Sequence, residues 1–216
     1  MSLNKDLKIL HEEILNSLPA DLRKQLILEN EKLFSSLLEE KALKAGNNVP
    51  DVLFRDESLK AVYLKDLLKN HHIVLSFFRG TWCPYCNLEL ESLARINDQI
   101  EGKGAKLIAV TPELYKFAEE RIKKNNFHFQ VLTDLGNKAA DEFGLVFELP
   151  HEYREIYKRL SVHLNILNGE DSWVLPMPAT FIISKQGIIK STYINADYTQ
   201  RMEPDDILEK LDSLSS

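Results

Sequence analysis

Short runs of β-branched and aromatic residues alternate with segments of helical periodicity from about residue 49 to the C-terminus, and this alternation constrains the fold most strongly. It predicts a layered α/β structure built around one central sheet. Between the last two runs lies the turn-like stretch Ser184–Gly187, so we expect them to form an antiparallel hairpin attached to an otherwise more parallel sheet. The predicted strands are Ile73–Phe78, Leu107–Thr111, Phe129–Leu132, Thr180–Ile183 and Ile188–Ile194.

The residues before this α/β region repeat leucine and isoleucine at helical spacing, with a break near Pro19. They predict two or three amphipathic helices. Turn residues and a proline in the stretch 44–50 are typical of a linker, so we assign 1–46 to an N-terminal helical extension and 47–216 to the main domain.

Two further helices are expected within the main domain: one inserted between residues 150 and 164, and a closing helix that begins at Pro204. The apolar face of the inserted helix, which carries Tyr153, Ile156, Tyr157 and Leu160, can pack on the domain's own core, cap the active site or form a dimer contact, and the stripe of the N-terminal helices must pack on this domain or on a second copy of the chain. A homodimer is therefore one expected arrangement.

Composition and charge restrict the classes of partner. The chain has 216 residues, of which 44% are hydrophobic, as in a globular protein with a real core. Its 27 Lys and Arg face 33 Asp and Glu, giving a net charge of -6 with no basic stripe, which argues against nucleic acid as a partner. Charged residues recur throughout the N-terminus, so we expect no signal peptide, no membrane span and a cytoplasmic location.

The only two cysteines, Cys83 and Cys86, lie in the segment FRGTWCPYCNLEL, where a predicted strand ends and a helix begins. Pro84 suits the first turn of that helix. Unpaired N–H groups at a helix N-terminus favour a thiolate, and the three-residue spacing allows both sulfurs to meet on one face of the turn. In a reducing compartment, such a pair indicates metal binding or redox chemistry rather than a structural disulfide.

A zinc site would require two further ligands, but no other cysteine exists and His71 and His72 are adjacent in sequence, which is a poor geometry for joint ligation. Two inert buried cysteines are the remaining alternative. The strand-to-helix position favours redox function, so the expected redox group is a reversible Cys83–Cys86 disulfide, with no cofactor.

From about Val49 to the C-terminus, the chain carries an ordered series of motifs: PDVLF (50–54), LKDL (64–67), CPYC with Glu89, VTPE (110–113), VLTD (131–134) with Asn137–Lys138, PATFII (178–183) and DYTQRMEP (197–204). This series resembles the thioredoxin-fold superfamily, and more closely the peroxiredoxin-like branch of the alkyl hydroperoxide reductase and thiol-specific antioxidant family. The resemblance implies a thioredoxin-like fold and a thiol-dependent peroxidase that reduces hydrogen peroxide or organic hydroperoxides. It also implies a thiol reductant such as thioredoxin, glutaredoxin or glutathione.

The cysteine motif can be aligned with peroxiredoxins or with thioredoxins and glutaredoxins, and these two alignments, called frames here, assign the nucleophile to different cysteines. In the peroxiredoxin frame the peroxide-attacking cysteine is Cys86, Cys83 occupies the position of the family's Thr or Ser hydroxyl, and Pro178 stands where the family has an arginine. The thioredoxin and glutaredoxin frame makes Cys83 the attacker and Cys86 the resolver, and it implies a cis Met177–Pro178 bond facing the disulfide. A peroxidase cycle in the first frame and a thiol–disulfide exchange cycle in the second both pass through the same Cys83–Cys86 disulfide.

Four neighbours complete the predicted site. Arg79 could supply positive charge in place of the missing family arginine, and Glu89 could orient it; Thr81 could donate a hydroxyl, and Trp82 could cover the dithiol. Three functions are compatible with these residues: a thiol-dependent peroxidase, a thioredoxin-like protein disulfide oxidoreductase, and a non-enzymatic redox-sensing or binding protein.

Overall fold

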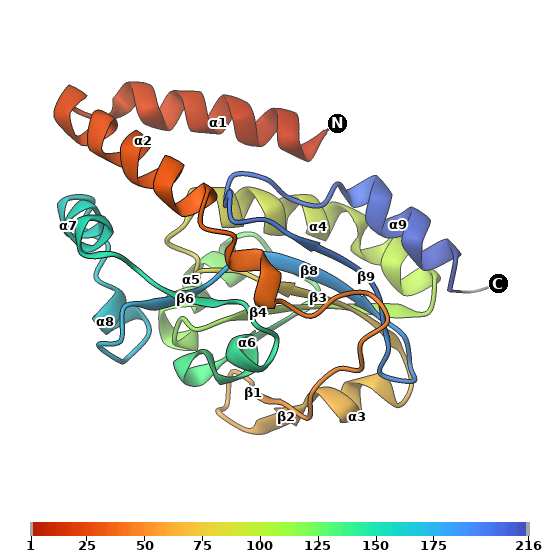
Figure 1. Cartoon of the computed structure of the whole chain (residues 1–216). Coiled ribbons are helices and arrows are strands. Elements are labelled where there is room, and N and C mark those ends of the chain that lie inside the picture. Colours follow the sequence, from red (N-terminus) through yellow and green to blue (C-terminus); the bar gives the residue numbers. More distant parts are fainter. Residues whose placement is uncertain (1, 215–216) are drawn as a thin grey trace.

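A seven-stranded mixed sheet with helices on both faces forms the body of the protein (Figure 1). The structure is a computed structural model that describes residues 2–214. Its helices are α1 (Leu3–Ser17), α2 (Ala20–Phe34), η1 (Leu38–Lys41), α3 (Leu64–Leu68), α4 (Pro84–Gly102), α5 (Tyr115–Lys124), η2 (Leu135–Asn137), α6 (Lys138–Glu142), α7 (His151–Arg159), α8 (Leu164–Leu167) and α9 (Pro204–Asp212). Its strands are β1 (Leu53–Arg55), β2 (Ala61–Tyr63), β3 (His72–Phe77), β4 (Ala105–Thr111), β5 (Gln130–Thr133), β6 (Val146–Glu148), β7 (Val174–Pro176), β8 (Ala179–Ile183) and β9 (Ile189–Ile194).

The main sheet has the order β2-β1-β5-β4-β3-β8-β9. β3, β4 and β5 are parallel, whereas β8 runs antiparallel to β3 and pairs with β9 as a hairpin. The predicted strands and the predicted terminal hairpin are therefore confirmed. β6 and β7 pair separately as a small antiparallel sheet.

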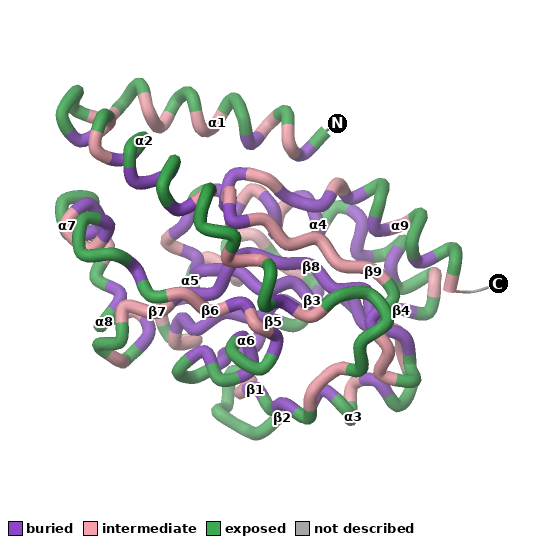
Figure 2. Tube along the Cα trace, viewed as in Figure 1, coloured by how far each residue is buried: buried purple, intermediate pink, exposed green. Residues whose placement is uncertain are grey.

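Alternate residues of each central strand point to opposite faces, because side chains in a strand have a period of two. On β3, Val74 belongs to the hydrophobic cluster that includes residues of α1, α2, α4, α7 and α9, whereas Ile73 and Leu75 belong to the cluster that includes residues of α3 and α6. Figure 2 shows the buried trace running through the central strands, with exposed residues on the outer surfaces of the helices. The predicted fold class, a thioredoxin-like α/β sheet flanked by helices and carrying N-terminal helices, is confirmed.

The N-terminal segment forms two helices that meet at Pro19, the residue that precedes the first turn of α2. α1 packs against α4, and α2 packs against α7 (Figure 1). The inserted helix predicted between residues 150 and 164 is α7, whose Tyr153, Ile156 and Tyr157 are buried. The boundary at residues 46/47 stays a prediction.

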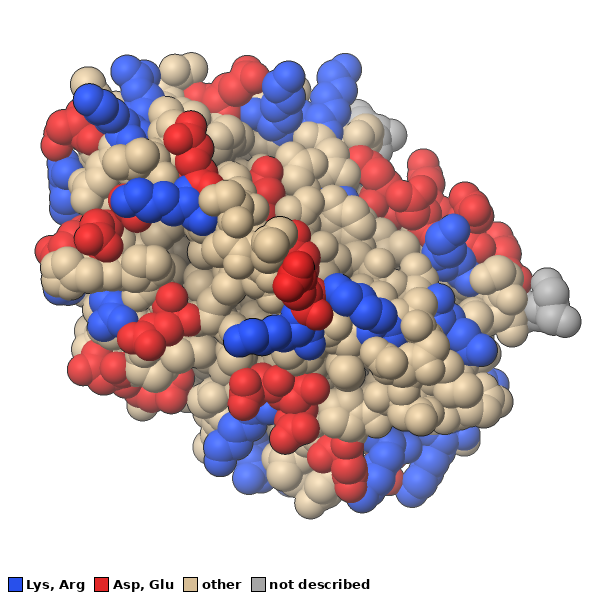
Figure 3. All heavy atoms as spheres, in the orientation of Figure 1, with Lys and Arg blue, Asp and Glu red and all other residues tan. Residues whose placement is uncertain are grey.

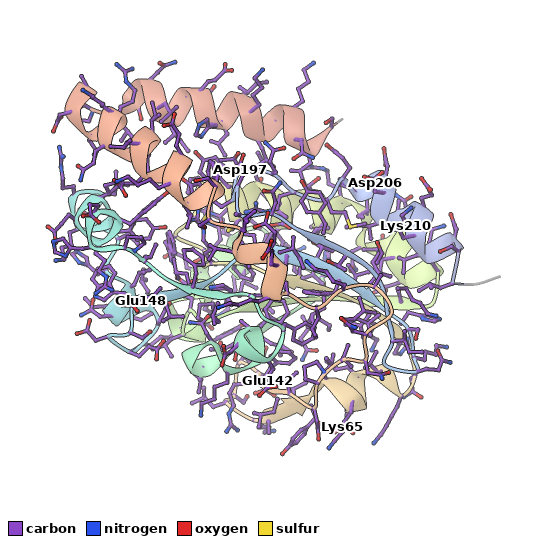
Figure 4. All side chains as sticks on the ribbon, viewed as in Figure 1. Lys65, Glu142, Glu148, Asp197, Asp206 and Lys210 are labelled. Atoms are coloured by element: carbon purple, nitrogen blue, oxygen red, sulfur yellow. The ribbon has the colours of Figure 1, made fainter. Side chains whose placement is uncertain are left out.

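The predicted closing helix is α9, with Pro204 in its first turn. Ile207 and Leu211 are buried against the body of the molecule, whereas Asp206 and Lys210 point outward from the helix (Figure 4). This separation of apolar and charged residues is the pattern that a helix covering one face of a sheet requires.

Charges of both signs are interspersed over the face drawn in Figure 3. Within residues 2–214, no helix is both long and apolar enough to cross a membrane. The same residues contain no group of three or more His, Cys, Asp or Glu side chains placed to hold a metal ion.

Candidate active site

The two cysteines lie at the junction of β3 and α4. A turn joins the two elements, closed by the hydrogen bond that Cys83 N donates to Gly80 O at 3.1 Å. Cys83 is the N-cap of α4, and its sulfur accepts a 3.4 Å hydrogen bond from Cys86 N. Pro84 follows at the start of the helix, where its missing N–H costs nothing. The predicted placement of both thiols at a helix N-terminus is confirmed.

Gly80 is required by the close packing of this turn. Its φ is +152°, and a Cβ there would lie 2.2 Å from Trp82 Nε1. We expect Gly80→Ala to destabilise the fold by about 1–3 kcal/mol, because the indole must move or the backbone must strain. Gly102→Ala, in the open last turn of α4, is the matched control and should be neutral or slightly stabilising. Denaturant unfolding of both variants measures the difference, and equal stabilities would contradict the expectation.

Arg79 holds the first sulfur. Its Nη2 donates to Cys83 Sγ at 3.0 Å, and both residues are buried, with exposed fractions of 4% and 0%. Burial alone would raise the pKa of Cys83, but the hydrogen bond from the Cys86 thiol and the charges of Arg79 and Arg201 outweigh it and lower the pKa to about 5. Cys83 is therefore a thiolate at neutral pH.

Cys86 is the protonated member of the pair. Burial and the neighbouring Cys83 thiolate raise its pKa well above the ordinary value, although Arg201 opposes them. Arg201 Nη2 lies 3.7 Å from Cys86 Sγ. One shared negative charge on two adjacent thiols is the expected result, because ionising both would place like charges side by side in a buried site.

Glu89 binds Arg201 rather than Arg79, which corrects the partner expected from the sequence. Arg201 Nε lies 2.5 Å from Glu89 Oε2, and each side chain is only 2% exposed. Burial raises the pKa of Glu89 to about 7, while Arg201 lowers it. Because a guanidinium stays charged throughout the ordinary pH range and the contact is this short, we take the ionised pair as the state near neutral pH.

Aromatic side chains cover the sulfurs. Tyr198 stacks on Arg79, with the guanidinium carbon 4.0 Å from the ring centroid, and Tyr157 OH accepts a 3.0 Å hydrogen bond from Arg79 Nη1. Trp82 packs edge-on against Tyr157, with centroids 5.5 Å apart, and Tyr85 does the same against Tyr198. The dithiol is thus enclosed by rings that come from three separate segments of the chain, around residues 82–85, 157 and 198.

The structure brings most of the predicted site residues together. Arg79 contacts Cys83, Cys86 donates its N–H to Cys83, and the guanidinium carbon of Arg79 lies 5.4 Å from the Trp82 ring centroid. Thr81 takes part through its backbone: its N–H donates to Glu113 Oε2 at 2.7 Å and its carbonyl accepts from the Asn87 side chain at 2.8 Å. A catalytic role for the Thr81 hydroxyl stays a prediction.

The prediction of a cis Met177–Pro178 bond is wrong, since no peptide bond in residues 2–214 is cis. The pairing of β7 with β6 continues through Met177, whose N–H donates to Leu145 O at 2.8 Å, so the extended chain passes directly into β8. Met177 packs in the cluster on the sheet face opposite the cysteines. The predicted thioredoxin-type presentation of backbone by a cis proline is therefore absent at this bond.

Sequence reasoning missed Arg201 and Tyr198, and it named Tyr157 only as part of a helix face that could cap the site. The segment that holds Tyr198 and Arg201 stands out in the sequence as a motif, but the motif indicates no contact with the cysteines, which lie more than a hundred positions away. Asp197, labelled in Figure 4, begins this segment and accepts hydrogen bonds from Thr199, which shapes the turn.

A strand-to-helix dithiol on a mixed sheet, with one thiolate beside a buried arginine, defines the class of thioredoxin-fold thiol oxidoreductases. The AhpC/TSA family model matches residues 45–192. The chain therefore belongs to the AhpC/TSA family, which confirms the predicted resemblance and the predicted class, a peroxidase-type oxidoreductase.

The individual relatives have low sequence identity to this chain, but the similarity extends over most of its length. A putative peroxiredoxin bcp of Helicobacter pylori is 25% identical over 71% of this chain and 89% of its own length. A thiol-disulfide oxidoreductase ResA of Geobacillus kaustophilus is 26% identical over 82% of this chain and 81% of its own. Among solved structures, peroxidoxin BcpB from Mycobacterium tuberculosis superposes with a TM-score of 0.63 at 17% identity, covering 81% of this chain and 99% of that one.

Proposed function

We propose that this protein reduces peroxides through a dithiol cycle in which Cys83 attacks and Cys86 resolves. The observation that carries the assignment is the 3.0 Å contact between Arg79 Nη2 and Cys83 Sγ, because the thiolate is the nucleophilic form of cysteine. The peroxidase class rests on family membership. The choice of attacker follows the order of the thioredoxin frame rather than that of the peroxiredoxin frame.

The atoms balance as follows. The Cys83 thiolate attacks one peroxide oxygen, the O–O bond breaks, and the leaving alkoxide or hydroxide takes up a proton, leaving a sulfenic acid on Cys83. Cys86 then attacks the Cys83 sulfur, forming the disulfide and releasing water. A thiol reductant returns both cysteines to the starting state by exchange. Arg79 lies beside the attacking sulfur and Arg201 beside the resolving sulfur, so these two buried guanidinium groups are the candidates to stabilise the negative charge that develops at the leaving oxygen.

The second candidate is a protein disulfide oxidoreductase, which the similarity to ResA proteins favours. Burial argues for the peroxidase. Both sulfurs are 0% exposed, and a peroxide needs a much smaller opening than a disulfide carried on a folded protein. Thioredoxin, glutaredoxin or glutathione is proposed as the reductant and a cytoplasmic location as the setting, because free thiols persist in reducing compartments.

The test is treatment of the reduced protein with one equivalent of hydrogen peroxide. We expect rapid loss of both thiols, consumption of the peroxide, and a mass lower by two hydrogens from the disulfide. Insulin reduction in the presence of a dithiol is measured in parallel. Rapid insulin turnover without peroxide consumption would favour the second candidate and overturn the first.

A further inference from the structure

Neither sulfur can be reached from solvent in the reduced protein, since Cys83 and Cys86 are both 0% exposed. Every reactant must nevertheless touch a sulfur atom. Part of the cover must therefore move during the cycle. A candidate for the moving part is the helical hairpin, defined here as residues 2–34, which carries α1 and α2 and whose α1 packs against α4 (Figure 1).

The hairpin fixes the arginine that touches Cys86. The Asn4 side chain forms hydrogen bonds with both backbone polar groups of Arg201. Its Nδ2 donates to Arg201 O at 2.8 Å, and its Oδ1 accepts from Arg201 N at 2.9 Å. Glu203 accepts from the first N–H groups of α1, including Leu3 N at 2.8 Å. These contacts join the first turn of α1 to the segment that places the Arg201 guanidinium beside Cys86.

The hairpin also supports the arginine that touches Cys83. Asn30 Oδ1, on α2, accepts hydrogen bonds from Tyr153 OH and from Tyr198 OH, the latter at 3.0 Å. Tyr198 in turn stacks on Arg79. A third link joins His11 Nδ1 to Tyr85 OH at 2.8 Å. The hairpin therefore contacts the backbone of Arg201, the Tyr198 ring that stacks on Arg79, and the Tyr85 ring.

The two arginines differ in their counter-charges. Arg201 is paired with the Glu89 carboxylate, a counter-charge that is not one of the redox-active thiols. Arg79 is surrounded by thiols and phenols: burial would lower its pKa, but Cys83, Tyr157 and Cys86 raise it well above the ordinary value. Within residues 2–214, no ion pair joins Arg79 to a carboxylate. Its main anionic partner is the Cys83 thiolate.

Oxidation removes that partner. One peroxide and one proton from solvent convert the Cys83 thiolate and the Cys86 thiol into a neutral disulfide, one alcohol or water from the peroxide, and one water from the sulfenic acid. The Arg79 guanidinium then remains buried without an anion. An uncompensated buried charge is strongly unfavourable, so the oxidised site should favour a conformation in which water reaches Arg79.

We propose that the helical hairpin is a redox-responsive lid, closed over the Cys83 thiolate and loosened when the Cys83–Cys86 disulfide forms, so that a thiol reductant can reach the disulfide. The inference rests on the proposed dithiol cycle. It explains how a site that admits a small peroxide through local motion also admits a reductant whose sulfur must align with the S–S bond. Asn4 and Asn30 are positioning residues in this account.

Amide hydrogen exchange of the full chain tests the lid. Reduced protein is compared with protein oxidised by diamide, a thiol oxidant that does not depend on peroxidase activity. We expect amides of residues 3–34 and 198–203 to exchange at least about tenfold faster in the disulfide form, with β3 and β4 unchanged. Equal exchange of the hairpin in both forms overturns the proposal, and so does a uniform acceleration that includes β3 and β4.

Single-cysteine variants separate charge from cross-linking. Reduced Cys83→Ser lacks the thiolate and should show the fast hairpin exchange of the disulfide form, whereas reduced Cys86→Ser keeps the thiolate and should match reduced wild type. Slow exchange in both variants would remove the charge argument. If Cys83→Ser does not fold, the wild-type comparison decides alone.

Asn30→Ala tests the positioning role. We expect fast hairpin exchange in its reduced form, and a higher midpoint for thiolate formation, measured by ultraviolet absorbance, because Arg79 loses the ring that supports it. Asn16→Ala, on the exposed face of α1, is the matched control. An unchanged thiolate midpoint in Asn30→Ala would leave Asn30 a merely structural residue. If wild-type protein consumes no peroxide but its hairpin still exchanges faster in the disulfide form than in the reduced form, the proposed function is refuted and the lid proposal is supported.

Discussion

Replacing Cys83 by serine is expected to lower the rate of peroxide consumption by at least about 100-fold at neutral pH. The remaining thiol, Cys86, is protonated there, and a thiol whose pKa lies above 9 is less than about 1% thiolate at pH 7. Burial, the largest cause of the raised pKa of Cys86, persists in the variant. Arg201, the nearest cation, is already paired with Glu89.

Cys86→Ser is the matched control for this result. It should consume a single equivalent of peroxide rapidly, because the Cys83 thiolate and Arg79 remain, and then stop for lack of a resolving thiol. Mass spectrometry after one equivalent should find the added oxygen on Cys83. If Cys83→Ser instead forms a sulfenic acid on Cys86 at the wild-type rate, attack belongs to Cys86, as the peroxiredoxin frame implies.

Arg79→Met is expected to raise the midpoint of Cys83 thiolate formation by about one to three pH units from its value of about 5. Removing the guanidinium takes away a charge 3.0 Å from the sulfur and leaves a buried thiolate with fewer donors. The peroxide reaction should slow by about 10²–10³-fold at saturating thiolate, because the same group stabilises charge on the leaving oxygen.

The pH profile gives the sign of this effect. In wild type, the reaction rate should rise as the pH increases through about 5 and then level, since the lowered pKa makes the thiolate available above that point. In Arg79→Met the rise should move to higher pH. Arg79→Lys keeps the charge and should recover part of the rate. Arg95→Met, on the exposed face of α4, is the control; a profile of Arg79→Met identical to wild type would exclude Arg79 from thiolate stabilisation.

Local patterns predicted much of this structure because the chemistry that produces them is local. Short continuous runs of apolar and β-branched residues such as Ile73–Phe78 are typical of strands buried on both faces, and the break at Pro19 separated two helices because proline lacks an N–H. The position of Cys83 and Cys86 at a helix start followed from the predicted strand before them, from Pro84 in the first helical turn and from the helical periodicity after Cys86. Arg79 lies only four positions before Cys83, so its place beside the cysteines could also be predicted from the sequence.

Three expectations failed or fell short because they depended on contacts between distant segments. The Met177–Pro178 bond is trans because β7 continues in the extended conformation from its pairing with β6. Glu89 binds Arg201, which is 112 positions away. The role of Cys83 as the thiolate depends on two guanidinium groups and on burial, which no spacing in the sequence reports.

By itself, the sequence determined the strand-to-helix dithiol, the α/β layering and the presence of helices before the main domain, because propensity, periodicity and capping act over a few residues. Only the tertiary structure decided which thiol carries the charge, which arginines hold the sulfurs and what the N-terminal helices cover. Charge and burial act through space: Asn4, Asn30 and Arg201 become neighbours of the dithiol only after the hairpin and the C-terminal segment fold over α4.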